Sequence, residues 1–228
     1  MSNSKNLYQL TVIVAAYNQE DYIGRCLRSL LAQSMPHKDY QIIVVDDGST
    51  DKTPYTLSQF VCPGDSVLKI ITLPENRGLP SALNAGILAS NSKYIVRVDS
   101  DDFVNKRFLD FLYYYLETNS TACDAVACDY LLIDESENVL QRCSARDNPI
   151  ACGILFKTEC LIKAGLYDES FLRHEERELR IRFEKSYSIH HLDVPLYRYR
   201  QHSSNITLDS ALMEYHSQRI IDKHGTLQ

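Results

Sequence analysis

The sequence predicts an α/β fold in which a doubly wound, mostly parallel central sheet is flanked by helices and followed by a smaller mixed region. Three observations lead to this class. Apolar, β-branched runs recur along the first half of the chain, each run gives way to a segment with helical spacing, and acidic residues directly follow two of the runs. Runs without polar alternation are typical of strands buried on both faces of a parallel sheet. In a doubly wound sheet, ligands bind beyond the carboxyl ends of the strands.

The first two strands are expected at 10–17 (LTVIVAAY) and 41–45 (QIIVV). Between them, apolar residues recur at the i, i+4, i+7 and i+8 positions, which predicts a helix over 20–33. Turn residues after the second strand precede a short helix at 53–60. The chain is therefore expected to begin with two strand–helix units.

Two further strands are expected at 67–73 and 93–98, separated by a helix at 79–90. Pro80 falls in the first turn of that helix, where proline is tolerated because an N–H at this position has no helical partner. The fourth strand runs directly into an acidic cluster at 99–102.

In the second half of the chain the regular alternation stops. Segments 124–133 and 139–142 are expected to form a hairpin, and 187–199 should be extended but broken by Pro195. A helix over 210–224 is expected to close the fold. We interpret this half as the acceptor side of the molecule.

Charge and composition exclude several classes of protein. A net charge of -6 and a pI near 5.6 argue against a protein that coats nucleic acid or an anionic membrane, since both tasks need clustered Lys and Arg. The seven cysteines are scattered without a CxxC pair, so they indicate neither a disulfide framework nor a zinc site. Residues 1–6 are polar, and no run of roughly 18 apolar residues could span a bilayer. One soluble, cytoplasmic domain over 1–228 is expected.

The strongest chemical signal is the cluster of Asp99, Asp101 and Asp102 at the end of the fourth predicted strand. Like charges this close repel one another, and a hard divalent cation would offset the repulsion. Mg²⁺ or Mn²⁺ binds through one or two carboxylates and keeps sites for phosphate oxygens, which suits a nucleotide diphosphate. The alternative is a solvated turn in which Asp102 caps the next helix.

A second acidic pair, Asp46 and Asp47, follows the second strand, and Tyr17 ends the first. These side chains would line one crevice and could hydrogen-bond the base and ribose of a nucleotide. Arg77 adds a cation near the sheet edge that could face a diphosphate. The alternatives are an ordinary Asp-Asp-Gly-Ser turn and a surface arginine.

Taken in order, these motifs resemble the family 2 glycosyltransferases of the GT-A fold, from about residue 10 to about residue 207. The matching segments are VIVAAYN at 12–18, VDDGS at 45–49, NRG at 76–78 through NAG at 84–86, and VDSDD at 98–102. Each segment alone is a weak signal, whereas their common order is specific. The resemblance implies a nucleotide-sugar site lined by Ala15, Tyr17, Asp46 and Asp47, with Tyr17 and Asp47 beside the base.

The resemblance also implies roles for the acidic cluster. Asp99 is expected to face the ribose or diphosphate. Asp101 is expected to be the main metal ligand, and Asp102 is the alternative residue for this role. Leu83 stands where the family often has arginine, so Arg77 is the residue expected to supply that phosphate contact instead.

The segment HEEREL at 174–179 resembles the family's Glu-Asp-x-Glu-Leu segment at the start of a helix, which implies Glu176 as the catalytic base. An inverting transfer needs a carboxylate that takes the proton of the acceptor hydroxyl as its oxygen attacks the anomeric carbon. Glu176 stands where aspartate is usual, with the same functional group on a longer arm. The alternative is that Glu175, Glu176 and Glu178 only favour a helix N-terminus.

The segment YRQH at 199–202 resembles the Tyr-Arg-x-His segment with which related enzymes close over the diphosphate and metal. The resemblance implies that His202 completes the metal sphere and that Arg200 neutralises the leaving group. The alternative for His202 is a solvent-exposed loop residue.

The expected function is that of a metal-dependent, inverting glycosyltransferase with a UDP-sugar donor. The acceptor is a saccharide or lipid-linked saccharide in surface polysaccharide synthesis, at the inner face of the membrane or in the cytoplasm. The nucleotide-sugar half is expected over 7–118, the acceptor and base half over 119–207, and a C-terminal helix over 208–228. Two alternatives are a catalytically impaired nucleotide-sugar-binding scaffold and a nucleotidyltransferase, which would more often carry a glycine-rich, basic loop after the first strand.

Overall fold

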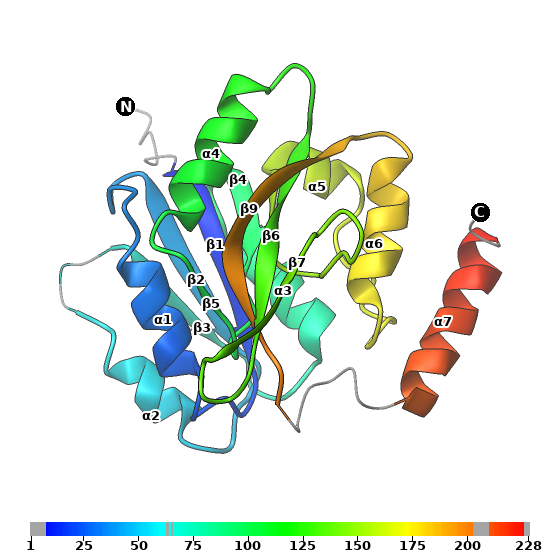
Figure 1. The fold of residues 1–228 in the computed structure, drawn as a ribbon. Helices are drawn as coiled ribbons and strands as arrows, with labels where there is room; N and C mark the ends of the chain where they lie inside the picture. Colours follow the sequence, from blue (N-terminus) through cyan, green and yellow to red (C-terminus); the bar gives the residue numbers. More distant parts are fainter. Residues whose placement is uncertain (1–7, 63, 65, 203–209, 226–228) are drawn as a thin grey trace, which may run out of the picture.

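The computed structural model describes residues 8–62, 64, 66–202 and 210–225 (Figure 1). The first half alternates strands and helices as predicted: β1 (Tyr8–Ala16), α1 (Ile23–Leu31), β2 (Tyr40–Asp46), α2 (Thr53–Ser58), β3 (Leu68–Thr72), α3 (Leu79–Leu88) and β4 (Ser92–Arg97). These four strands pair in parallel in the order β3-β2-β1-β4. The predicted parallel arrangement is therefore confirmed for this half.

The second half contains short strands and helices of mixed direction: β5 (Phe103–Val104), α4 (Phe108–Thr118), β6 (Ala125–Ile133), β7 (Val139–Cys143), β8 (Ile154–Lys157), α5 (Thr158–Lys163), α6 (Glu175–Glu184), β9 (Ile189–Arg200) and α7 (Ser210–His224). Strands β6 and β7 form the predicted hairpin. Strand β8 is antiparallel to both β4 and β6, whereas β9 is parallel to β6. One sheet of nine strands in the described residues runs through both halves.

The prediction that Pro195 breaks the last extended segment is wrong. Strand β9 continues through Pro195, and the register between β9 and β6 shifts on both sides of its partner Asp129. An irregularity of this kind interrupts the regular ladder of hydrogen bonds between two strands. Proline, which has no backbone N–H to donate, can therefore be accommodated at this position. The strand therefore reaches Arg200 without interruption.

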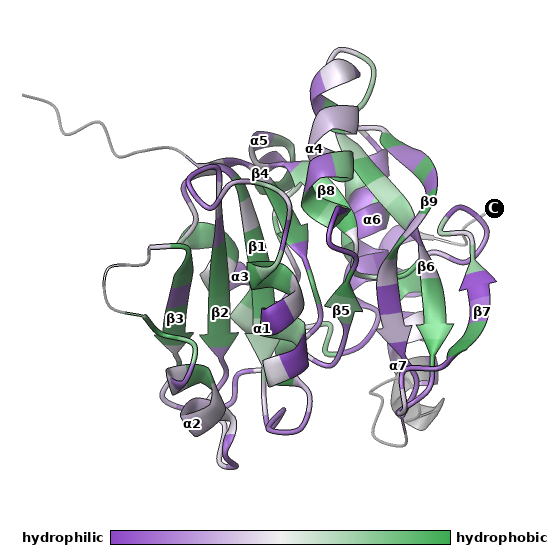
Figure 2. Cartoon of the chain, turned by 60° about the vertical axis from the view of Figure 1, so that its left-hand side comes forward, coloured by the Kyte–Doolittle hydropathy of each residue, from purple (hydrophilic) through white to green (hydrophobic). Residues whose placement is uncertain are grey.

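Helices cover both faces of the parallel strands. Helices α1 and α3 lie on opposite faces of the sheet (Figure 1), and Figure 2 colours β1 and β2 as mainly hydrophobic. Every residue of β2 is buried, as expected for a strand without polar alternation. Gly86 lets α3 approach β1 closely, since a Cβ at this position would lie 2.8 Å from Cγ2 of Ile13. This contact fixes α3 against the sheet.

Parallel pairing places the carboxyl ends of β1, β2 and β4 at the same edge of the sheet. Tyr17, Asp47 and Asp99 follow these ends, as predicted. The antiparallel pairing of Phe103 in β5 with Arg198 in β9 brings a distant segment to the same edge. The acidic cluster and the end of β9 therefore meet there.

None of the helices in the described part of the chain combines the length and the apolar character needed to cross a membrane. The polar segment at 1–6 lies outside the described residues, and so does 203–209, which contains the predicted boundary before the C-terminal helix.

Candidate active site

Asp47 fixes the loop that carries Arg77. Its Oδ1 and Oδ2 atoms accept hydrogen bonds of 2.9 Å from the backbone N–H groups of Arg77 and Gly78, respectively. Gly78 has φ 90°, a conformation that a side chain would strain. The carboxyl group of Asp47 is buried, while the Arg77 side chain is exposed. Asp47 therefore holds this loop at the end of β2.

Asp46 shapes the turn that follows β2. It is buried, and its Oδ1 accepts a hydrogen bond of 3.1 Å from the backbone N–H of Ser49. Ala15 is half-buried in β1, whereas Tyr17 is 42% exposed. Of the residues predicted to line the nucleotide site at the ends of β1 and β2, Tyr17 thus offers the most accessible side chain.

Arg97 joins the end of β4 to the start of α6. Its Nε and Nη2 atoms donate to the two carboxylate oxygens of Asp99 at 2.6 and 3.3 Å, and its Nη1 donates to Oε1 of Glu175 at 2.9 Å. Arg97 and Glu175 are both buried. A charged group in the interior needs such partners, because burial without them is unfavourable. Asp99 and the helix predicted to carry the base are therefore physically linked.

Arg97 belongs to none of the motifs recognised in the sequence. A signal was present, because a single arginine interrupts the apolar run of β4 just before the acidic cluster. A charge in a strand buried on both faces implies an opposite charge nearby. What the sequence does not supply is the identity of its second partner, Glu175.

Glu176 lies beside this ion pair at the start of α6 and is half-buried. Burial and the neighbouring charge of Glu175 raise the pKa of Glu176 to about 7, against the opposing effect of Arg97. A carboxyl group whose pKa lies near neutral pH is suited to accept a proton from a substrate hydroxyl.

Asp101 and His202 lie together although 101 positions separate them in the sequence. The Nε2 atom of His202 is 2.9 Å from Oδ2 of Asp101. The imidazole ring stacks on Tyr22, with the ring centroids 4.9 Å apart. His202 is buried, so the alternative of an exposed loop histidine is wrong.

Asp102 is buried and ties the acidic cluster to β9. Its Oδ2 accepts a hydrogen bond of 2.8 Å from the Tyr197 hydroxyl, and its Oδ1 accepts one of 2.7 Å from the backbone N–H of Arg200. Burial and the charges of Asp101 and Asp99 raise the pKa of Asp102 well above its usual range. These bonds differ from the helix cap that was the alternative interpretation of Asp102.

Arg200 is buried and contacts the backbone at Asp101. Its Nε donates to the backbone carbonyl of Asp101 at 3.0 Å. Its Nη1 donates to the carbonyl of Glu135 at 3.1 Å, and its Nη2 to Oε1 of Glu137 at 3.3 Å. The guanidinium therefore connects the acidic cluster to the β6–β7 turn.

Asp99, Asp102 and Cys152 form a second cluster, with one ligand atom of each within 4.8 Å of the others. Burial and the charges of Asp99 and Asp102 raise the pKa of the Cys152 thiol well above its usual range. A soft sulfur ligand is poorly suited to Mg²⁺ or Mn²⁺. The pair of Asp101 and His202 is the better candidate for a hard cation.

Two predicted residues stay apart from this centre. Among the described residues, the side chains of Tyr17 and Arg77 form no hydrogen bond or ion pair with the acidic cluster or with α6. They stand on the loops that follow β1 and β3, at the same edge of the sheet as the end of β4.

Comparisons with known proteins agree with these motifs. The model of the family described as glycosyl transferase family 2 matches residues 11–182. A poly(ribitol-phosphate) beta-glucosyltransferase of Bacillus spizizenii is 37% identical over 114 residues, which make up 50% of this chain and 18% of that protein. The chain therefore spans less than a fifth of the length of this relative.

Two solved structures are similar to the whole described fold. Staphylococcus aureus TarS in complex with UDP-GlcNAc has a TM-score of 0.74 at 21% identity, covering 96% of this chain and 68% of that one. The mannosyltransferase PcManGT from Pyrobaculum calidifontis, in complex with GDP-Man and Mn²⁺, has a TM-score of 0.75 at 19% identity, covering 96% and 65%. These likenesses confirm the predicted GT-A fold.

Proposed function

The chain belongs to glycosyl transferase family 2, and we propose that it transfers a sugar from a nucleotide-diphospho-sugar, with inversion, to a hydroxyl of a saccharide or lipid-linked saccharide. One observation carries the proposal. Arg97 joins Asp99, at the donor end of β4, to Glu175, which directly precedes Glu176. A carboxylate able to act as a base is thereby held next to the strand end where the donor would bind.

We propose a UDP-sugar as the donor, bound over the ends of β1, β2 and β4. Ala15, Asp46 and Asp47 would form the floor of the nucleotide site, and the accessible ring of Tyr17 would contact the base. The complex of TarS with UDP-GlcNAc supports this choice. The exposed Arg77, on the loop that Asp47 holds, is available to contact the diphosphate.

Asp101 and His202 fit a divalent cation. Their ligand atoms lie 2.9 Å apart, which agrees with the spacing of about 3 Å between adjacent ligands of an octahedral ion bound at about 2.1 Å. Both oxygens of Asp102 already accept hydrogen bonds, so we assign Asp102 to holding Asp101 in place. The Mn²⁺ in PcManGT supports a metal here. When bound, Mn²⁺ or Mg²⁺ would stabilise the negative charge of the departing diphosphate.

Glu176 is proposed as the general base. It would take the proton of the acceptor hydroxyl while that oxygen forms a bond to the anomeric carbon and the bond from this carbon to the nucleotide diphosphate breaks. The buried pair of Arg97 and Glu175 would orient the start of α6 so that Glu176 faces the donor. Arg200, which holds the backbone at Asp101, would position the metal ligand rather than contact the leaving group.

The acceptor is proposed to be part of a surface polysaccharide, and the reaction to take place in the cytoplasm or at the inner face of the membrane. The name of the Bacillus relative, a poly(ribitol-phosphate) beta-glucosyltransferase, supports a polymeric acceptor. The family match favours a transferase of sugars over a nucleotidyltransferase.

The proposed function is tested by incubating the chain with UDP-sugars, Mn²⁺ and oligosaccharide or lipid-linked acceptors. Released UDP and the anomeric configuration of the product are measured, the latter by NMR. A β-linked product from an α-linked donor supports inverting transfer. Donor binding without UDP release, whatever the acceptor, would instead support the scaffold alternative.

A further inference from the structure

We propose that α7 positions the start of α6, where Glu176 lies, and that Ser217 and Lys223 of α7 are positioning residues for the transfer reaction. This inference rests on the proposed function, because it concerns the same carboxylate. Its evidence lies in the contacts between α7 and residues 168–178.

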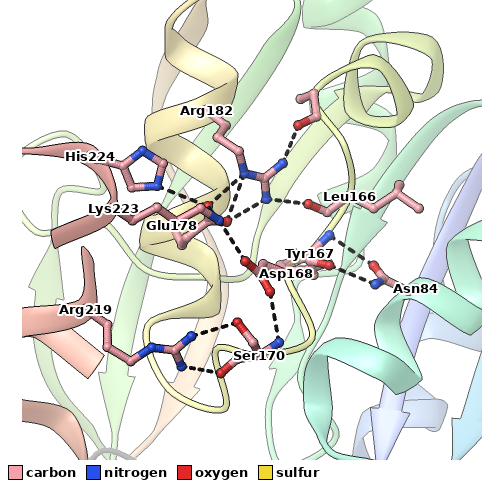
Figure 3. A network of polar contacts seen from close by, with 11 residues as sticks. Asn84, Leu166, Tyr167, Asp168, Ser170, Glu178, Arg182, Arg219, Lys223 and His224 are labelled. Carbon is pink, nitrogen blue, oxygen red and sulfur yellow. Dashed lines mark hydrogen bonds and ion pairs between the residues drawn. The ribbon is translucent and has the colours of Figure 1, made fainter. Parts of the chain in front are cut away.

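Glu178 of α6 has no exposed surface. Basic side chains from two helices, α6 and α7, contact its carboxylate. Figure 3 shows it between Arg182 of α6 and the side chains of Lys223 and His224 of α7. The Nε atom of Arg182 is 2.9 Å, the Nζ of Lys223 2.7 Å, and the Nε2 of His224 3.1 Å from Oε1 of Glu178. Because a buried charge is unfavourable without partners, the contacts of Lys223 and His224 with this carboxylate link α7 to α6.

Two residues of α7 also reach the segment before α6. The Nζ atom of Lys223 lies 2.7 Å from Oδ2 of Asp168. One turn earlier in the helix, Arg219 donates to the carbonyl and hydroxyl oxygens of Ser170 at 2.6 and 2.9 Å (Figure 3). Lys223 therefore ties three elements together: α7, α6 and the segment around 168–170.

The same segment is held on its other side by α3. The side chain of Asn84 donates to the backbone carbonyl of Tyr167 at 2.9 Å and accepts from its backbone N–H at 3.0 Å. Residues 167–170 thus lie between α7 and α3, and α3 packs against the sheet. The start of α6 is therefore connected to the sheet through contacts of α7 with residues 168–170 and of these residues with α3.

Ser217 contacts the turn at which α6 begins. Its hydroxyl oxygen lies 3.0 Å from Nε2 of His174, the residue before Glu175 and Glu176. His174 has φ 58°, a left-handed conformation that is uncommon for a residue with a side chain and persists where surrounding contacts fix it. Ser217 is therefore placed to hold the turn that sets the direction of the first residues of α6.

The position of Glu176 decides whether it acts as a base. A general base must lie within hydrogen-bonding reach of its proton, and a displacement of about 1 Å reduces rate by about a hundredfold. Polar contacts from α7 to the rest of the described chain go to residues 168–178, not to the loops around Tyr17 or Arg77. Loosening α7 should therefore reduce turnover and leave donor binding unchanged.

The experiment compares the parent chain with Lys223→Met, Lys223→Arg and the milder Ser217→Ala. Gln218→Ala is the matched control, since Gln218 lies in the same helix and its side chain bonds to Asp222 within α7. Hydrogen–deuterium exchange of segment 168–178, kcat with UDP-sugar and acceptor, and the Kd of the donor are measured on each.

Lys223→Met and Ser217→Ala should speed exchange in 168–178, leave exchange in β1 and β2 unchanged, and lower kcat by about tenfold to a hundredfold. The donor Kd should stay within about twofold. Lys223→Arg should recover most of the loss, and Gln218→Ala should behave as the parent.

Unchanged exchange in 168–178 for both Lys223→Met and Ser217→Ala would overturn the inference, even if turnover fell. Faster exchange with unchanged kcat would also overturn it, because α7 would then hold the segment without positioning Glu176. Absence of transfer by the parent chain would instead contradict the proposed function, and the exchange measurement would still decide whether α7 holds the start of α6.

Discussion

Arg97 and Glu175 form a buried ion pair in which the Nη1 atom of the arginine lies 2.9 Å from Oε1 of the glutamate. The pair crosses from the central sheet to the helix that begins the proposed catalytic segment. It also explains why three carboxyl groups, those of Asp99, Glu175 and Glu176, lie so close together: one buried cation offsets part of their mutual repulsion.

Replacing Arg97 by methionine should destabilise the fold strongly. Methionine keeps much of the volume but leaves Asp99 and Glu175 without their partner, and breaking a buried pair in this way costs about 3–5 kcal/mol. Urea unfolding measures the effect. The matched control is Lys163→Met, which removes the exposed pair of Lys163 and Glu159 and should change the unfolding midpoint far less. Equal midpoints for the two variants would contradict this role of Arg97.

Asp101→Ala should abolish Mn²⁺-dependent binding of the nucleotide-sugar while the chain remains folded. Asp101 contributes a carboxylate oxygen beside the imidazole of His202, and its loss leaves one of two proposed ligands. Isothermal titration with and without Mn²⁺ measures the change. Parent-like affinity of Asp101→Ala in the presence of the metal would show that the ion, if it binds, does so elsewhere.

Asp102→Ala should behave differently, because Asp102 accepts hydrogen bonds from Tyr197 and the backbone of Arg200. Leaving those buried donors without an acceptor costs about 1–3 kcal/mol each. Thermal unfolding should therefore show a lower Tm for Asp102→Ala than for Asp101→Ala. The reverse order would contradict the role of Asp102 in holding the end of β9.

The prediction for the nucleotide concerns Tyr17 and Asp47. A crystal soaked with UDP should place the base in contact with the accessible ring of Tyr17 and next to the loop that Asp47 holds. Density for the base beside the β6–β7 hairpin instead would overturn the proposed orientation of the donor.

The pKa of Glu176, raised to about 7, gives a pH dependence with a definite sign. The base acts in its ionised form, so kcat/KM should rise about tenfold per pH unit below about pH 7 and level off above it. Rates are measured from about pH 5.5 to about pH 9 at saturating metal. A rate that is constant across this range would show that no group with such a pKa accepts the proton.

Much of this arrangement could be predicted because it follows from local patterns. Apolar runs predicted the four parallel strands. The point at which each run stops predicted that Asp47 and Asp99 follow the carboxyl ends of two of these strands. The contact between Asp101 and His202 was implied by two separate motifs. These features depend on short segments whose partners are set by the fold class.

The remaining features depend on packing between distant segments. The second partner of Arg97 is fixed only when α6 packs beside β4, and nothing near Glu175 in the sequence marks it. The contacts of Arg200 with the backbone at Asp101 and Glu135 likewise join segments far apart in the sequence, and no local pattern marks them. Pro195 did not end β9, because an irregular register accommodates it.

Glu176 is the proposed general base, and the variant Glu176→Gln examines this role. The substitution keeps the shape of the side chain and removes the proton acceptor. Glu184→Gln is the matched control, since Glu184 ends the same helix in an exposed pair with Arg180. If Glu176 acts in the transition state, Glu176→Gln should lower kcat by at least about a hundredfold at nearly unchanged donor affinity, and Glu184→Gln should match the parent. Parent-like turnover by Glu176→Gln would show that Glu176 is not the general base.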